Sequence, residues 1–173
     1  MITFGACTRH ARPPRGNIAI FNRSHYEDVL VTRVHKIISE GKAKKRLGHI
    51  NDFERMLVDE GTVIVKFFLN ISKEEQLERL KSRLDDPSRN WKFSTEDLRE
   101  RGFWDDYIKI FNETLTATNT SVAPWWVVPS DKKWIRNLVV SEVVRKTLRD
   151  LRLQWPNPEF DLEKARRSIS RSK

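Results

Sequence analysis

The chain alternates between short, dense apolar runs and longer stretches in which apolar residues recur every three or four positions. The dense runs at residues 17–21, 62–69 and 124–129 are rich in β-branched and aromatic residues, and they predict buried strands. The stretches between them have helical spacing. Strands that alternate with helices predict a parallel sheet covered by helices on both faces, and therefore an α/β fold.

Local signals predict where several helices begin and end. A helix that starts at Ser24 is expected to end at Gly41, and a second helix, which starts near residue 50, to end at Gly61. Ser72 opens a third helix as the first residue of a capping box, and the Asp-Pro pair at residues 86–87 ends it.

Further helices are predicted after this break. Ser94 or Thr95 is expected to cap a short helix, and two longer helices follow over residues 103–115 and 131–153. In the helix that ends at Gly61, the spacing predicts that Phe53, Met56 and Leu57 face the core, as in the amphipathic helices of globular domains.

Composition divides the chain into three parts. Residues 1–15 are basic and irregular, residues 16–156 form the expected domain, and residues 157–173 form a basic tail, which we expect to be solvated and frayed from Lys164 onward. The seventeen aromatic residues (9 Phe, 6 Trp and 2 Tyr) argue against wholesale disorder.

Charge and cysteine content narrow the partners and the compartment. The 33 Lys and Arg exceed the 24 Asp and Glu, and the resulting net charge of +9 favours polyanionic partners. No apolar run approaches the ~20 residues of a membrane-spanning helix, so we expect no membrane partner. The N-terminus has no pattern typical of a secretory signal, and Cys7 is a lone cysteine, so we expect a cytoplasmic protein.

Several kinds of catalytic site are excluded by motif. The four histidines lack zinc-ligand spacing, and no G-x-S-x-G segment occurs. The Gly41-Lys42 pair is followed by Ala43 instead of Ser or Thr, so it is not a Walker A loop. None of the six glycines builds a phosphate cradle.

The polar residues that follow the first expected strand are the main candidates for chemistry. Asn22, Arg23 and Ser24 stand at its carboxyl end, where open α/β sheets bind ligands. An arginine beside a helix N-terminus suits a phosphate through its fork geometry and the helix dipole. Alternatively, Ser24 only caps the helix and Arg23 is solvated.

Two basic clusters offer further sites for anions. For the cluster within residues 36–46, a solvated surface is favoured over a binding site. The cluster within residues 79–92 is more indicative of a binding role, because it flanks a helix break and a loop that contains Trp91.

A series of sequence blocks resembles the polyphosphate kinase 2 family. The Walker B region of that family is similar to residues 21–30 (Phe-Asn-Arg-Ser-His-Tyr-Glu-Asp-Val-Leu). Further similar blocks follow in order at residues 50–54, 61–62, 66–76, 86–87, 91–94, 104–107, 123–125, 128–129 and 133–134. The resemblance covers about residues 16–156.

The resemblance implies a P-loop-kinase-like fold with α/β/α layers and a helical lid over about residues 79–102. It implies Mg²⁺-dependent phosphoryl transfer between inorganic polyphosphate and nucleoside mono- and diphosphates of the AMP/ADP/ATP type, a reaction of positioning and charge neutralisation. Nucleic acid is then not an expected partner.

The same resemblance implies roles for individual residues. Arg23 would bind transferred or nucleotide phosphates, and Glu27 would contact the nucleotide. Asn22 stands where many relatives carry a metal-linked aspartate, which implies an indirect metal role. Arg79, Arg83 and Lys92 would be lid cations that close over phosphates, a task to which arginine is well suited.

One departure from the family is large. The family carries a Gly-rich Walker A loop upstream of the Walker B strand, whereas the residues before Gly16 do not resemble that loop. We therefore expect an N-terminally incomplete domain that is inactive alone. The alternatives are a non-catalytic polyanion-binding module and a truncated gene product. An absent strand would leave apolar strands unpaired, so self-association into a homo-oligomer is also expected.

Overall fold

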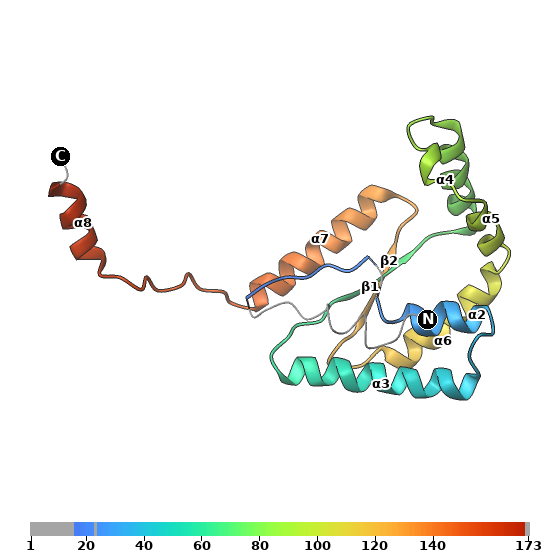
Figure 1. Ribbon diagram of the computed structural model, residues 1–173, viewed down its shortest axis with the longest axis horizontal. Helices are drawn as coiled ribbons and strands as arrows, with labels where there is room; N and C mark the ends of the chain where they lie inside the picture. Colours follow the sequence, from blue (N-terminus) through green and yellow to red (C-terminus); the bar gives the residue numbers. More distant parts are fainter. Residues whose placement is uncertain (1–15, 23, 172–173) are drawn as a thin grey trace. The chain divides into compact units, whose positions relative to one another are not determined.

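The computed structural model describes residues 16–22 and 24–171 (Figure 1). The chain divides into two compact units, Met1–Arg136 and Asn137–Lys173. The domain boundaries expected from composition remain predictions.

The sheet of the first unit consists of two parallel strands in the described residues. Strand β1 (Lys66–Asn70) pairs with β2 (Trp125–Pro129), and the register places Lys66 opposite Trp125. The strands are parallel because a long helical crossover joins them. The predicted α/β class and parallel pairing are confirmed. The predicted first strand of this pair is shorter than expected, since residues 62–65 precede the ladder.

Residues 17–21 do not form the buried strand that the sequence predicts. They are exposed, with Ile18 and Ile20 at 75% and 89% of full exposure. An apolar run becomes a buried strand only where a neighbouring strand and a covering helix accept it. The two-stranded sheet of the described residues does not extend to this run.

The two helices predicted before Gly61 have other boundaries in the structure. They are α2 (Glu27–Val34) and α3 (Glu40–Asp59). Gly41 does not end a helix; it lies in the first turn of α3, because the hydroxyl of Ser39 accepts a hydrogen bond from the Lys42 N–H and caps that helix. Helix α3 therefore begins about ten residues earlier than predicted. Gly61 ends it as expected, with a positive φ of 83°.

The core of the first unit lies where α2, α3 and α6 (Trp104–Thr118) pack together, below the strand pair in Figure 1. Its buried residues come from α2 and the residue before it, from α3 and from α6: Tyr26, Val29, Leu30, Val34, Ala43, Leu47, Ile50 and Ile110. The expected inward position of Met56 is wrong, since its side chain is 54% exposed.

An arm of three short helices connects β1 to α6. It consists of α4 (Lys73–Asp85), the 3-10 helix η1 (Asn90–Lys92) and α5 (Thr95–Arg101). The hydroxyl of Ser72 accepts a hydrogen bond from the Glu75 N–H, as predicted. Of the two candidates for the next cap, Ser94 and Thr95, it is the Ser94 hydroxyl that accepts, from the Glu96 N–H. We call residues 73–101 the arm.

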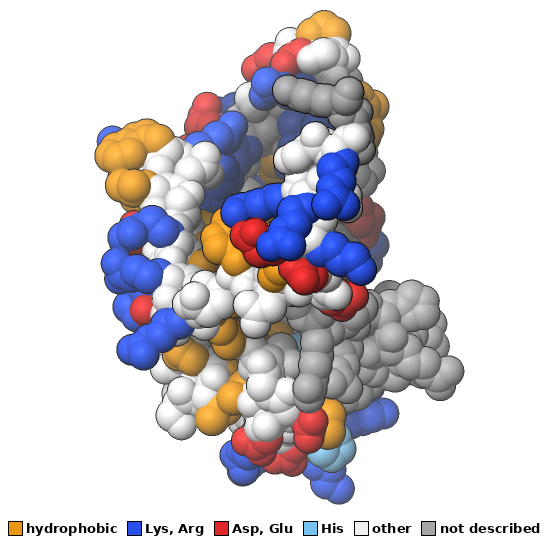
Figure 2. Space-filling model, turned by 90° about the vertical axis from the view of Figure 1, so that its left-hand side faces the viewer, with side chains coloured by type: hydrophobic (Ala, Val, Ile, Leu, Met, Phe, Trp, Pro, Cys, Tyr) orange, Lys and Arg blue, Asp and Glu red, His pale blue; other side chains and the backbone are white. Residues whose placement is uncertain are grey.

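The second unit holds most of α7 (Lys133–Asp150) and all of α8 (Leu162–Arg171). The carboxylate of Asp161 accepts hydrogen bonds from the N–H groups of Glu163 and Lys164 and caps α8. Apart from the half-buried Ala165, residues 164–171 of the expected tail are exposed, and the fraying of this tail stays a prediction. No helix in the described ranges is long and apolar enough to cross a membrane. Basic, acidic and hydrophobic side chains are interspersed on the face drawn in Figure 2.

Candidate functional site

The candidate residues that precede α2 lead into a tight turn. The carbonyl of Ser24 accepts a hydrogen bond from the Glu27 N–H at 3.1 Å, and the hydroxyl of Ser24 accepts one from the Tyr26 N–H at 3.4 Å. We call these residues the 24–27 turn. Asn22 precedes it and is exposed, while Arg23 lies outside the described residues. Ser24 thus organises the turn.

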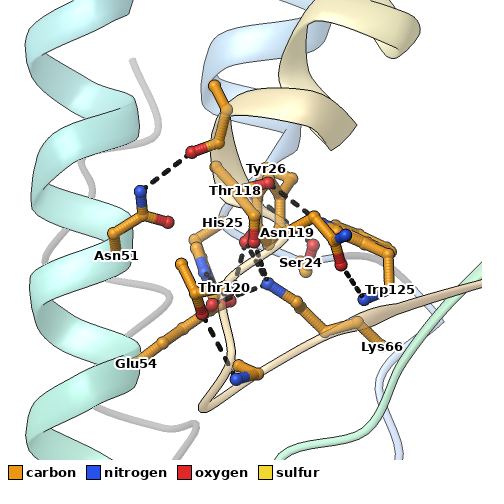
Figure 3. Close-up of polar contacts among 12 residues, drawn as sticks. Ser24, His25, Tyr26, Asn51, Glu54, Lys66, Thr118, Asn119, Thr120 and Trp125 are labelled. Atoms are coloured by element: carbon orange, nitrogen blue, oxygen red, sulfur yellow. Dashed lines mark hydrogen bonds and ion pairs between the residues drawn. The ribbon is translucent and has the colours of Figure 1, made fainter.

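Tyr26 anchors this turn to the interior of the first unit (Figure 3). Its side chain is 3% exposed, and its hydroxyl donates a hydrogen bond of 2.7 Å to Oε1 of Glu54. Its ring meets that of Trp125 edge to face at 4.9 Å and stacks on His25 at 4.8 Å. Aromatic pairs in this geometry add to the energy of burial.

Lys66 extends from β1 into the same cluster and uses all three of its ammonium donors. Nζ donates to Oε2 of Glu54 at 2.7 Å, to the hydroxyl of Tyr26 at 3.0 Å and to the carbonyl of Thr118 at 2.9 Å. The ammonium also lies over the rings of Tyr26 and Trp125, at 5.4 and 4.9 Å from their centres. The charge is therefore both paired and enclosed.

Burial and pairing act in opposite directions on these groups. Burial lowers the pKa of Lys66, against the opposing effect of the Glu54 carboxylate. Burial alone would raise the pKa of Glu54, but the His25 ring at 3.8 Å and hydrogen bonds from Lys66 and Tyr26 hold it below its usual range. Burial, with the nearby Glu54 charge, raises the pKa of the Tyr26 hydroxyl, which is a neutral donor at physiological pH.

Sequence reasoning did not identify this cluster as part of the site. We call Tyr26, Glu54 and Lys66 the buried triad. Its signal in the sequence is a pair of opposite charges at core-facing positions, since Glu54 follows Ile50 by one helical turn and Lys66 lies within the apolar run at residues 62–69. Charged residues are almost never fully buried unless they are paired.

Glu27, the expected nucleotide contact, is the first residue of α2 and is half-buried. Its charge is a minor contributor to the raised pKa of Tyr107, which comes mainly from burial and from the hydrogen bond to Glu100. Glu27 therefore lies within electrostatic range of the α5–α6 region.

Arg79, Arg83 and Lys92 all lie on the arm, apart in sequence from the 24–27 turn. Arg79 donates to the carboxylate of Glu75 and to the carbonyls of Ser130 and Asp131, at 2.8, 2.6 and 3.3 Å. These bonds fix the base of the arm to the end of β2. Part of its guanidinium is therefore committed to the protein itself.

The other two arm cations are more open to solvent. Arg83 forms a 3.2 Å ion pair with Asp97, in which both side chains are about 40% exposed (38% and 41%). The ammonium of Lys92 lies over the ring of Trp91 at 5.0 Å from its centre, and Trp91 itself is 76% exposed. Such exposed pairs contribute little to stability, so these cations are available to exchange partners.

Among the described residues, no group of three or more His, Cys, Asp or Glu is placed to hold a metal ion. A hollow of about 440 Å³ lies between α2, α3 and α6, away from the predicted site residues. One of its lining cations, Arg33, is bound to Glu40 and Glu113.

Comparison with known proteins gives a consistent result. The family model described as Polyphosphate kinase 2 matches residues 6–155. The chain is 50% identical to the AMP/ADP-polyphosphate phosphotransferase of Meiothermus ruber, over 88% of this chain and 57% of that protein. It is 42% identical to the ADP-polyphosphate phosphotransferase of Rhodopseudomonas palustris, over 83% of this chain and 54% of that one. The chain thus spans about half the length of these relatives.

Solved structures show the same similarity in three dimensions. The crystal structure of Polyphosphate Kinase 2 from Arthrobacter aurescens TC1 superposes with a TM-score of 0.94 at 42% identity, over 98% of this chain and 60% of that one. A putative polyphosphate kinase 2 from Pseudomonas aeruginosa gives 0.78 at 33% identity, over 83% and 31%. The predicted fold class is confirmed.

Proposed function

The chain belongs to the polyphosphate kinase 2 family, and we propose on that premise that it takes part in phosphoryl transfer between inorganic polyphosphate and a nucleoside mono- or diphosphate. The observation that carries this proposal is the 50% identity to a relative named AMP/ADP-polyphosphate phosphotransferase. We therefore propose AMP and ADP as the nucleotides that are phosphorylated.

We propose that two regions of the chain contact phosphates. Arg23 acts directly before the 24–27 turn, with Glu27 on the nucleotide side, and Arg83 and Lys92 act from the arm. Arg79 joins them at the base of the arm. Phosphoryl transfer requires neutralisation of the negative charge on the oxygens of the transferred group. Cationic side chains can supply this neutralisation if they exchange an exposed protein partner for a phosphate. The exposure of the Arg83–Asp97 pair supports this role.

We propose that Mg²⁺ enters the site with the phosphates of the substrate. Magnesium usually keeps several waters and takes one or two protein ligands together with substrate phosphates, so a cluster of acidic side chains is not required. Asn22, which is exposed beside the 24–27 turn, is the residue that we assign to this ion, through water. The ion supplies neutralisation of phosphate charge when it is bound.

Binding by the chain is the first test. We expect long-chain polyphosphate to bind with an affinity that falls steeply as salt rises. The variant Arg23→Ala/Arg83→Ala should bind more weakly than Lys42→Ala/Lys44→Ala, which removes the same charge from α3. Equal losses in the two variants would mean that binding reflects net charge alone and would sink the site assignment.

Turnover is the second test, with the chain, polyphosphate, Mg²⁺ and AMP or ADP, and with nucleotides separated by chromatography. We expect no turnover by these 173 residues alone, because they contain no Gly-rich phosphate loop. Activity should appear when a polypeptide that carries such a loop is added. Turnover by the chain alone that is lost in Arg23→Ala would overturn this expectation. Binding without turnover in either arrangement would favour a polyanion-binding module.

A further inference from the structure

Helix α2 and the 24–27 turn cannot derive their geometry from local interactions alone. Helix α2 has eight residues, and isolated helices shorter than about 12–15 residues are marginal in water. Its N-cap position is occupied by Tyr26, whose side chain makes no capping hydrogen bond. The start of the helix therefore depends on tertiary contacts in addition to the local hydrogen bonds of Ser24.

Both backbone ends of this segment depend on Tyr26. Its N–H donates to the hydroxyl of Ser24, and its carbonyl accepts the hydrogen bond from Leu30 that begins the helical ladder. A displacement of Tyr26 therefore moves the turn and the first turn of α2 together. Asn22 and Arg23 directly precede this turn in the sequence.

The hydrogen bonds of the Tyr26 hydroxyl have a fixed direction. An ammonium cannot accept a hydrogen bond and a carboxylate cannot donate one, so the hydroxyl must accept from Lys66 and donate to Glu54. Both partners are themselves fixed, since Lys66 donates to Glu54 and to the carbonyl of Thr118. The hydroxyl thus occupies a position defined by α3, β1 and the end of α6 (Figure 3).

From this geometry we propose that Tyr26 is a positioning residue for phosphate binding, through the contact of its hydroxyl with Glu54 and Lys66. The buried triad holds the 24–27 turn in one orientation, and with it the start of α2 and the residues directly before the turn. The proposal rests on the proposed function for its phosphate-binding part, whereas its structural part concerns the turn alone.

Tyr26→Phe is the test variant, and the chain offers a matched control. Phenylalanine keeps the ring contacts with Trp125 and His25 and removes only the hydroxyl. Tyr107→Phe removes the same group from α6, where it donates to Glu100 at the same distance of 2.7 Å. The Tyr107 phenol is uncharged, because burial raises its pKa, so the control changes no charge near Glu27.

The experiment has two readouts. The first is amide hydrogen exchange of Glu27, whose N–H closes the 24–27 turn, and of Leu30, whose N–H begins the helix. We expect Tyr26→Phe to lower protection of both by about tenfold, and Tyr107→Phe to leave it unchanged. The second is binding of inorganic tripolyphosphate below the melting temperature of each variant, for which we expect roughly tenfold weaker binding only in Tyr26→Phe.

Each outcome decides the inference. A purely structural role for Tyr26 predicts a lower melting temperature with wild-type exchange at Glu27 and wild-type binding, and that result overturns the proposal. Equal effects of the two variants overturn it as well. If the wild-type chain binds no tripolyphosphate, the proposed phosphate site fails, and the exchange data alone decide whether the triad positions the turn.

Discussion

Lys66 and Glu54 form an ion pair of 2.7 Å in which both side chains are almost wholly buried, at 6% and 2% exposure. Two charges of opposite sign are thereby removed from water at the point where β1 meets α3. A paired charge of this kind is tolerated because each desolvated group finds its partner, and an unpaired one is not.

Removal of one partner of the Lys66–Glu54 ion pair should therefore strongly destabilise the fold. We expect Lys66→Met to lower the free energy of unfolding by ~3–5 kcal/mol, because the Glu54 carboxylate is left buried and uncompensated. Urea unfolding followed by circular dichroism measures this loss. Lys81→Met is the matched control, since Lys81 pairs with Glu78 at the surface, and it should cost at most about 1 kcal/mol. Similar losses in the two variants would contradict the role assigned to burial.

Acid should weaken the fold through Glu54. Because the pKa of Glu54 is held below its ordinary value of 4.5 in the folded state, its contribution is complete above that value and is lost as the pH falls through the lower, folded pKa. Melting temperatures measured between neutral and acidic pH should fall less steeply below 4.5 in Glu54→Gln than in the wild type. If the melting temperature of Glu54→Gln falls with pH as steeply as that of the wild type, other carboxyl groups cause the acid sensitivity.

Gly41, within α3, and Gly61, just after its C-terminus, should respond differently to substitution by alanine, as measured by protein stability. Gly61 has a φ of 83° and closes a Schellman motif, in which the Thr62 N–H donates to the carbonyl of Leu57, so Gly61→Ala should cost ~1–2 kcal/mol. Gly41 is helical and has open space around an added Cβ, so Gly41→Ala should be neutral or stabilising by up to about 1 kcal/mol. Thermal melts of both variants provide the comparison, and losses of equal size would be inconsistent with the conformational argument.

The exposed apolar segment at residues 17–21 should promote self-association. Ile18 and Ile20 present large hydrophobic surfaces, and Ile18→Thr/Ile20→Thr should shift sedimentation towards monomer. Leu162→Thr/Ile169→Thr removes two exposed apolar side chains from α8 and should leave association unchanged. A monomeric wild-type protein, or association abolished only by the α8 variant, would refute this prediction.

Local signals predicted much of the fold, and they failed where the outcome depended on distant residues. The caps at Ser72 and Ser94 and the stop at Gly61 were predicted because each depends on a few neighbouring residues. Gly41 was assigned wrongly, because Ser39 supplies a competing start signal two residues earlier. The segment at 17–21 was assigned wrongly, because burial of a strand requires partners that its own sequence does not specify.

The same distinction holds for the candidate site. The family blocks identify residues of the 24–27 turn and of the arm, since those motifs are contiguous. The buried triad was not predicted as a unit, because Tyr26 and Lys66 are 40 positions apart and their contact exists only after α3 and β1 have packed. The roles of Arg79, Arg83, Lys92 and Glu27 in binding stay predictions.

The hydrogen bonds at the base of the arm have a consequence for how this region tolerates change. Arg101, at the end of α5, donates to the carbonyl of Lys73 and to the side chain of Gln76 at the start of α4, so the exit of the arm is fastened to its entrance. The arm is therefore a closed loop, whose two ends are held together by the hydrogen bonds of Arg101. Residues inserted at the tip of the arm, near residue 88, lengthen this loop without moving its base. The entropy cost of closing a loop grows only slowly with its length. Evolution and engineering can therefore vary the reach of this arm while the strands beneath it keep their register.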